Sequence, residues 1–400
     1  MMKDSKTKKT IAITKLTYQK LPFYFRWLFY PVKFIYRLAH KLRIDIWIIS
    51  GKEHLNTPLT IIFAGCERNK NYFAKLAFDS SYSEIHIGKK WLWNLFRIVS
   101  KGAQDYSLIV LEMDRAFYRL FNSKKSFFIP CWIGGEVDIS GDISSLIKTD
   151  SHKTDIRRIK KYNMQFEVTN ERCQFDNFYN HMYLPYITNA HRNTAFPMTD
   201  SDMKKNFKNC DLLLIKKEKE YIGGVLLIYR KSVPCIWSFG VKDGNTDYLK
   251  AGVIGAQCYF AVVYLKEKGY KKMHFGGSRA FLKDGVLQYK KERGLQVMGS
   301  PRKGFLMKPL SNSAGTKGFF LRNPFIYLNK TKLTGAVFVE NDQLSSEKDF
   351  EKIYKDFYIK GLSRLNIYLF GENERNIREI IPSKYLDKMS ICSAERLFQK

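Results

Sequence analysis

The stretch KKMHFGGSRAFLKDGVLQYKKERG, residues 271–294, combines a short strand, a pair of glycines and a polar helix. We predict the strand over residues 271–275 and the helix over residues 284–293, where apolar residues recur at helical spacing. Gly276 and Gly277 lie between them, and a backbone without Cβ atoms can turn sharply there or approach a ligand closely. The local pattern leaves two alternatives open: a strand-to-helix turn without chemistry, and a corner that binds a ligand.

The composition predicts a globular chain with a strongly basic surface. The 400 residues are 45% hydrophobic and 15% aromatic, which is enough for two or three folded cores. The formal net charge is +30 at pH 7, so the field of the protein attracts polyanions. RNA, anionic lipid headgroups and phosphorylated cofactors all fit this charge, and composition does not choose among them.

The cysteines and the apolar segments bear on the cellular compartment. The 7 cysteines are scattered and form no CxxC pair, which favours reduced thiols in the cytosol and argues against a zinc site. No run approaches the roughly 20 uninterrupted apolar residues of a spanning helix. Residues 1–40 form a basic, aromatic N-terminal segment. Its part LPFYFRWLFYPVKFIYRLA, residues 21–39, either lies on an anionic membrane surface or packs on the protein's own core.

The order of predicted elements divides the rest of the chain into three parts. Residues 41–150 alternate strand-like and helical signals, which indicates an N-terminal α/β domain. Residues 151–310 contain two helices, a meander of three strands, a long helix near residues 248–268 and the strand 271–275. A right-handed crossover is the default connection between the last strand of the meander and that strand. Residues 311–400 show a strand, helix, strand order, which predicts a small C-terminal α/β extension.

This order of elements, together with three motifs, resembles the GNAT acyltransferase superfamily and, within it, the FemAB-like and cellulose-biosynthesis-associated acetyltransferase branch. The motifs are DIRRIKK at 155–161, FYNHMYLPYI at 178–187 and HFGGSRAFLKDGVLQYKKERG at 274–294. The last motif is the most specific of the three. The resemblance covers residues 155–297, and the C-terminal hundred residues show none.

The resemblance implies an α/β fold, with a GNAT-like mixed sheet flanked by helices. It also implies an N-terminal α/β domain that is itself a degenerate GNAT-like unit, and a small C-terminal βαβ unit. The implied activity is transfer of an acyl group to an amine or hydroxyl, in a cleft where the central sheet splays open. The donor is acetyl-CoA or another acyl-CoA, or an aminoacyl-tRNA in the Fem branch. We expect a sugar or related precursor of cell-surface polysaccharide as acceptor, and a cytoplasmic protein at the inner membrane face.

The superfamily binds the pyrophosphate of its donor with a Q/R-x-x-G-x-G/A loop that opens the long helix. The corresponding stretch here is KDGNTDYLKAGVIG, which matches that pattern only loosely. This departure puts in doubt the usual binding of the pyrophosphate by backbone N–H groups. The expected cofactor-binding residues are Phe239, Gly240, Lys250, Gly252 and Gly255.

Acyl transfer needs a base for the nucleophile, donors for the oxyanion and an acid for the leaving group. Asp284 could serve as base or orienter, and a helix N-cap explains it equally well. Tyr289 could donate a proton to a leaving thiolate, or pack in the core. An unperturbed histidine titrates near neutral pH, which makes His191 and His274 candidates, and a structural role is the alternative for each. The candidate catalytic residues are therefore Asp284, Tyr289, His191 and His274.

Basic residues surround the glycine pair and suit a phosphate-bearing ligand, although solvated helix charges are the alternative. The expected substrate-binding residues are Arg157, Arg158, Gly276, Gly277, Ser278, Arg279 and Lys290. The partner expected for them is an anionic small molecule or a lipid-linked sugar. We expect no metal site.

Two other functions compete with acyl-CoA chemistry. The charge permits aminoacyl-tRNA-dependent transfer, but the long heptad helical pair usual in Fem proteins is not found in the sequence. A non-catalytic protein that binds RNA or acidic membrane through its basic faces would show steep salt dependence and no acyl transfer.

Overall fold

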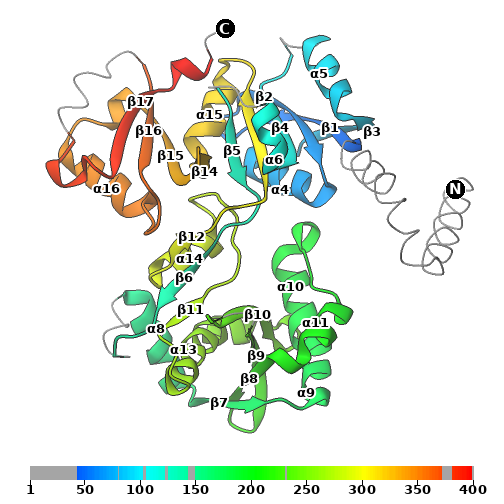
Figure 1. The fold of residues 1–400 in the computed structure, drawn as a ribbon, viewed down its shortest axis with the longest axis vertical. Helices are drawn as coiled ribbons and strands as arrows, with labels where there is room; N and C mark the ends of the chain where they lie inside the picture. Colours follow the sequence, from blue (N-terminus) through cyan, green and yellow to red (C-terminus); the bar gives the residue numbers. More distant parts are fainter. Residues whose placement is uncertain are drawn as a thin grey trace, which may run out of the picture.

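The computed structural model describes residues 43–398, apart from residues 80, 102–104, 122–124, 143–148, 230–231 and 372–380. Its strands form three sheets, of six, seven and four strands. Figure 1 shows two lobes: the six- and four-stranded sheets lie together in one, and most of the seven-stranded sheet forms the other. Within the described ranges, no helix is long and apolar enough to cross a membrane. The N-terminal segment 1–40 lies outside these ranges.

The six-stranded sheet has the order β3-β1-β2-β4-β13-β5. Its strands are β1 (Arg43–Lys52), β2 (Pro58–Gly65), β3 (Ser83–Trp91), β4 (Leu108–Asp114), β5 (Phe127–Pro130) and β13 (Lys303–Pro309). The helices of this part are α4 (Glu67–Ala77), α5 (Leu92–Lys101) and α6 (Arg115–Phe121). β2 and β4 are parallel neighbours and read as nearly continuous apolar runs, as expected for central strands whose two faces are both covered.

The seven-stranded sheet has the order β12-β6-β11-β10-β9-β8-β7. Its strands are β6 (Gly134–Asp138), β7 (Met164–Thr169), β8 (Cys210–Lys217), β9 (Glu220–Ile228), β10 (Cys235–Val241), β11 (Lys272–His274) and β12 (Gln296–Met298). β7 to β10 pair antiparallel in succession, and β11 then joins β10 in parallel. This is the predicted order of a meander followed by a crossover.

Helices cover both faces of the seven-stranded sheet. They are α8 (Asp150–Lys161), α9 (Arg172–Asn177), the π-helix η1 (Phe178–Tyr183), α10 (Leu184–His191), α11 (Asp200–Asn206), α12 (Thr246–Ala251), α13 (Val253–Glu267) and α14 (Gly285–Glu292). Successive residues of β9 point to opposite faces. A Cβ on Gly223 would meet Gln257 of α13, whereas a Cβ on Gly224 would meet Phe178 of η1. α13 and η1 therefore lie on opposite faces of the sheet.

The crossover differs from the prediction in one respect. The sequence predicts one helix near residues 248–268, and the structure has two, α12 and α13, with Gly252 between them. Gly252 has a φ of 92°, a left-handed conformation that glycine adopts at little cost and that ends α12. Because α12 intervenes, the first turn of α13 does not follow β10 directly.

The four-stranded sheet has the order β14-β15-β16-β17. Its strands are β14 (Phe325–Asn329), β15 (Lys332–Glu340), β16 (Leu365–Phe370) and β17 (Met389–Ser393), and its helices are α15 (Ala314–Arg322) and α16 (Glu347–Phe357). β15, β16 and β17 are parallel, with α16 between β15 and β16 in the chain. The predicted βαβ unit is therefore present.

The mixed α/β class, with sheets flanked by helices, is confirmed. The sheets do not follow the boundaries predicted at residues 150 and 310. β6, which precedes residue 150, lies in the seven-stranded sheet beside β11 and β12. β13, which precedes residue 310, pairs with β4 and β5 of the six-stranded sheet. Local pattern cannot reveal pairing between strands so far apart in the chain.

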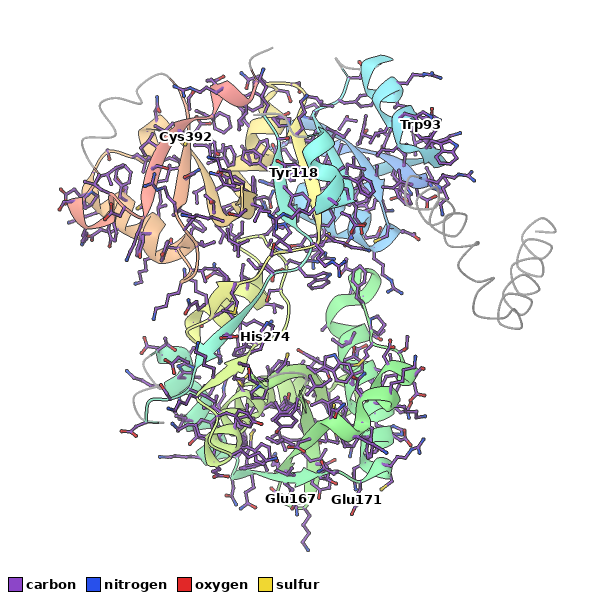
Figure 2. All side chains as sticks on the ribbon, viewed as in Figure 1. Trp93, Tyr118, Glu167, Glu171, His274 and Cys392 are labelled. Atoms are coloured by element: carbon purple, nitrogen blue, oxygen red, sulfur yellow. The ribbon has the colours of Figure 1, made fainter. Side chains whose placement is uncertain are left out.

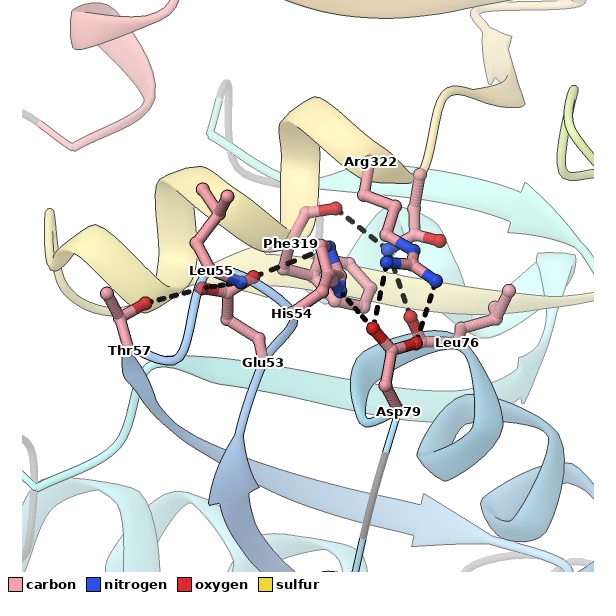
Figure 3. Close-up of polar contacts among 9 residues, drawn as sticks. Glu53, His54, Leu55, Thr57, Leu76, Asp79, Phe319 and Arg322 are labelled. Carbon is pink, nitrogen blue, oxygen red and sulfur yellow. Dashed lines mark hydrogen bonds and ion pairs between the residues drawn. The ribbon is translucent and has the colours of Figure 1, made fainter.

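Polar contacts tie the turn after β1 to α15 and to the end of α4 (Figure 3). Arg322 donates two hydrogen bonds to the carboxylate of Asp79, at 3.0 and 2.7 Å. His54 lies 3.6 Å from the same carboxylate. Asn323, which follows α15, donates to the carbonyl oxygen of Leu76 in α4 at 3.2 Å. These contacts fix the end of α4 against α15.

Gly240→Ala is expected to destabilise the fold, because a Cβ there would lie 2.6 Å from Cε2 of Phe178 and 2.8 Å from Cβ of Met182. Overpacking of this kind costs about 1–3 kcal/mol. Gly285→Ala is the control, since nothing lies within 4 Å of its Cβ position. Thermal unfolding followed by circular dichroism measures both variants. Equal melting temperatures would contradict the close packing around Gly240.

Candidate functional site

β10 and β11 form a parallel pair over one pair of residues, Cys235 and His274. Just beyond it Gly276 has a φ of 62°, and a Cβ there would lie 3.1 Å from the carbonyl oxygen of Ile236. The pairing with β10 ends here, while the chain stays paired on its other side, where Ser278 bridges Ile133. Figure 2 shows His274 at this point, where the two lobes meet.

A cavity of about 560 Å³ lies between the two strands where they separate, and we call it the splay cavity. Residues 236–239 of β10 and residues 275–279 after β11 line it from the sheet, while Tyr72 and Lys75 line it from α4. The remaining lining residues are Leu76, Trp132, Tyr183, Tyr186, Ile187, Thr194, Phe196, Phe281, Lys283, Asp284, Gly285, Val286, Lys290, Asn323 and Pro324. Both lobes therefore build the cavity, and the glycine pair lines it.

Two serine hydroxyls at the splay cavity have no hydrogen-bond partner among the described residues. Ser238 and Ser278 are 8% and 2% exposed, and neither Oγ forms a hydrogen bond. A buried polar group without a partner costs about 1–3 kcal/mol. Both residues line the cavity, and their hydroxyl oxygens are buried beneath its surface.

Lys290 brings an amine to the same cavity. Its side chain is 5% exposed, and Nζ donates to the carbonyl oxygen of Gly277 at 2.8 Å. Burial lowers the pKa of Lys290 to about 8. The amine therefore changes charge close to neutral pH, where it can act as a cationic donor or as a proton acceptor.

Asp284 fits both of its predicted roles. Its Oδ1 accepts hydrogen bonds from the backbone N–H groups of Val286 and Leu287, both at 3.1 Å, so Asp284 is the N-cap of α14. The same residue lines the splay cavity, and burial raises the pKa of its carboxyl group. Both capping bonds use Oδ1, so the cap does not occupy Oδ2.

The two candidate histidines are placed differently. Nδ1 of His274 accepts a hydrogen bond from the backbone N–H of Gly276 at 3.1 Å and lies 3.4 Å from Sγ of Cys235. Burial lowers the pKa of His274, and the residue lies where the strands part without lining the cavity. His191 is the last residue of α10, and its side chain lies outside the described part of the structure.

Tyr289 does not line the splay cavity. Its hydroxyl donates to Sγ of Cys258 in α13 at 3.3 Å, and the guanidinium carbon of Arg293 lies 3.4 Å from the centroid of its ring. Arg293 in turn pairs with the buried carboxylate of Asp155 in α8. These contacts give Tyr289 the packing role that was the alternative to catalysis.

Side chains of α8 lie against the expected pyrophosphate site at the start of α13. A Cβ on Gly255 would lie 2.1 Å from Oδ1 of Asp155, and a Cβ on Gly252 would lie 2.7 Å from Cδ of Arg158. Lys250 is exposed and lies 3.4 Å from a carboxylate oxygen of its helix neighbour Asp247. The two glycines thus accommodate side chains of α8, and Gly255 also lines a second cavity, of about 510 Å³, together with Asp155.

The other predicted residues divide in the same way. Phe239 lines the splay cavity, as do Gly276, Gly277, Ser278 and Arg279. Gly240 packs beneath η1, as its close contacts show. Arg157 and Arg158 lie on α8 and do not line the cavity. Among the described residues, no group of three or more His, Cys, Asp or Glu side chains is placed to hold a metal ion.

Sequence reasoning missed several lining residues. Tyr72, Lys75 and Trp132 belong to the part of the chain before the recognised motifs, and no local signal connects them to the glycine pair. Ser238 did carry a signal, because it is the polar residue within the apolar strand CIWSFGV.

Lys290→Met is expected to change the pH dependence of stability. The folded-state pKa of Lys290, about 8, lies below its ordinary value of 10.5, so the unfolded state binds more protons between these pH values. The free energy of unfolding of the wild type should therefore rise with pH over that range, and the variant should lack this contribution.

Urea denaturation at about pH 7.5 and about pH 9.5 measures the difference. Lys332→Met, at an exposed position of β15, is the matched control. If the free energies of unfolding of the wild type and of Lys290→Met differed by the same amount at both pH values, the lowered pKa of Lys290 would be contradicted.

No protein-family model matches this sequence, and no curated protein matches it. Similar solved structures include L-PGS from Bacillus licheniformis, at 12% identity and a TM-score of 0.34 over 68% of this chain and 87% of that one. FemX is similar at 14% identity and a TM-score of 0.35, over 65% of this chain and 83% of that one. A GCN5-related N-acetyltransferase from Sphaerobacter thermophilus is similar at 10% identity and a TM-score of 0.29, over 63% of this chain and 73% of that one.

Proposed function

We propose that this chain is an acyltransferase, which moves an acyl or aminoacyl group onto an amine or hydroxyl of an acceptor bound in the splay cavity. The observation that carries the proposal is the separation of β10 from β11 at Gly276, which opens a cavity between the two strands. The family resemblance of residues 155–297 implies acyl transfer in such an opening. The buried hydroxyls and charged groups that line the cavity suit that chemistry.

The lining residues can meet the demands of the reaction. Asp284, whose carboxyl pKa is raised by burial, would accept the proton of the attacking amine or hydroxyl. Lys290 in its charged form would stabilise the negative charge that develops on the carbonyl oxygen. The aromatic and aliphatic residues around them would limit the access of water.

The proposal has two forms, which differ in the acyl donor: an acyl-CoA or an aminoacyl-tRNA. Acyl-CoA chemistry would use the first turn of α13 for the pyrophosphate, but Asp155 and Arg158 occupy the space beside Gly255 and Gly252. This observation favours the second form, in which an aminoacyl-tRNA is the donor. The net charge of +30 suits a nucleic-acid donor as well.

The acceptor and the location follow from the resemblance. We propose a sugar or related precursor of cell-surface polysaccharide as acceptor, and a cytoplasmic protein that works at the inner membrane face. Whether the product is an amide or an ester depends on that acceptor.

Asp284→Asn is expected to lower the rate of transfer by about 100-fold or more, because a positioned base contributes at least that much. Asparagine still caps a helix, so α14 should keep its N-terminus and the melting temperature should change little. Tyr289→Phe is the comparison variant and should retain most of the activity, since its hydroxyl bonds to Cys258 outside the cavity.

Transfer is measured as release of free CoA or of deacylated tRNA in the presence of amino-sugar acceptors. Full activity of Asp284→Asn would remove Asp284 from the mechanism. No transfer from either donor to any acceptor would remove the proposed function.

The donor can also be tested by binding alone. Acetyl-CoA and CoA should leave the melting temperature unchanged, because a ligand raises it only by binding the native state. Aminoacyl-tRNA should bind with an affinity that falls steeply as the salt concentration rises. At equal charge, its affinity should be higher than that of heparin. Stabilisation by acetyl-CoA would instead support the acyl-CoA form.

A further inference from the structure

Arg279 is held in one orientation by two hydrogen bonds. Its Nη1 donates to the carbonyl oxygen of Cys131 at 3.2 Å, and its Nη2 donates to Oδ1 of Asn69 at 2.9 Å. The side chain is 6% exposed and lines the splay cavity. A guanidinium carries five N–H donors, so these two bonds leave donors over for a ligand.

Three aromatic rings pack on the same guanidinium. Its central carbon lies 4.4 Å from the ring centroid of Tyr72, 4.2 Å from that of Trp132 and 5.3 Å from that of Phe196. Such contacts stabilise a desolvated cation. A ligand in the cavity would meet the N–H donors of Arg279 that its two hydrogen bonds leave over.

A hydrogen-bonded chain leads from Arg279 into the six-stranded sheet. Nδ2 of Asn69 donates to Oε2 of Glu112 in β4 at 2.9 Å, and the backbone N–H of Cys66 donates to the same oxygen at 3.0 Å. A guanidinium only donates and a carboxylate only accepts, so the amide of Asn69 has one possible orientation. The chain Arg279–Asn69–Glu112 fixes the guanidinium without a direct ion pair.

The charges around Arg279 favour an anion. Among the described residues, Arg279 forms no ion pair, because Asn69 stands between it and Glu112. Lys75, Lys283 and Lys290 line the same cavity, and Asp284 is the single acidic residue of its lining. The positive charge of Arg279 is thus buried and oriented, and no bonded carboxylate neutralises it. An anionic ligand would stabilise this charge.

We propose that Arg279 is an oxyanion receptor, which binds a phosphate or carboxylate group of the acceptor through its N–H edge, and that Asn69 positions it by linking it to Glu112. This proposal rests on the proposed function in one respect, the identification of the ligand as the acceptor of the transfer. Phosphate and carboxylate share the geometry that a guanidinium edge recognises, with two oxygens facing two parallel N–H groups. The lobe with the six-stranded sheet thereby helps to select the substrate through Asn69 and Glu112.

Calorimetric titration with inorganic phosphate and, separately, with acetate tests the receptor on the full chain. The wild type should bind at least one of them, and the tighter probe identifies the class of oxyanion. Arg279→Lys keeps the charge but loses the planar edge, so the affinity should fall about tenfold or more. Lys332→Ala removes an exposed charge on β15 and should leave the affinity unchanged.

Asn69→Ala is the second variant, which guards against misfolding of Arg279→Lys. It leaves Arg279 in place and frees its orientation, so the affinity for the same probe should fall several-fold. In a transfer assay, this variant should raise KM for the acceptor and change kcat little, and Asn69→Gln should recover part of the loss.

Absence of binding of either probe to the wild type would overturn the receptor, and so would equal affinities of the wild type and Arg279→Lys. Anion binding that depends on Arg279, in a protein without acyl transfer, would keep the receptor and remove the proposed function. Transfer by a protein whose anion binding ignores Arg279 would do the reverse.

Discussion

The parallel ladder between β10 and β11 ends after one residue pair, and the candidate site depends on that interruption. A continued ladder would pair residues 236–239 with the segment after His274 and would leave no cavity between them. Gly276 lies where this pairing ends, with a left-handed backbone beside the carbonyl oxygen of Ile236. Lys290 donates to one backbone acceptor of this segment, the carbonyl oxygen of Gly277.

The surroundings of this opening come from distant parts of the chain. α4 contributes Tyr72 and Lys75. Its C-terminal end is fixed to α15 by the contact of Asp79 with Arg322 (Figure 3) and by that of Asn323 with Leu76. The six-stranded sheet reaches the cavity through the bonds of Glu112 and Asn69. The lobe with the six- and four-stranded sheets therefore contributes residues to the site.

The sequence predicted what short-range pattern controls: the order of strands and helices between residues 155 and 297, the strand-to-helix corner, and the cap at Asp284. It could not predict contacts between distant segments. Gly252 and Gly255 have the spacing of a phosphate loop, yet their missing side chains make room for Arg158 and Asp155 of α8. Tyr289 also lies in the most specific motif, and only the packing of α14 on α13 shows that its hydroxyl faces Cys258.

The exchange of β6 and β13 between sheets also constrains how the chain can fold. The six-stranded sheet is incomplete until β13 has been synthesised, although five of its strands precede residue 131. Such long-range pairings slow folding, because the entropy of closing a long loop is lost before the contacts form. On the ribosome, β4 and β5 emerge long before the strand that separates them. Their exposed edges are then a hazard for aggregation, and a chaperone would be most useful to this protein during that interval.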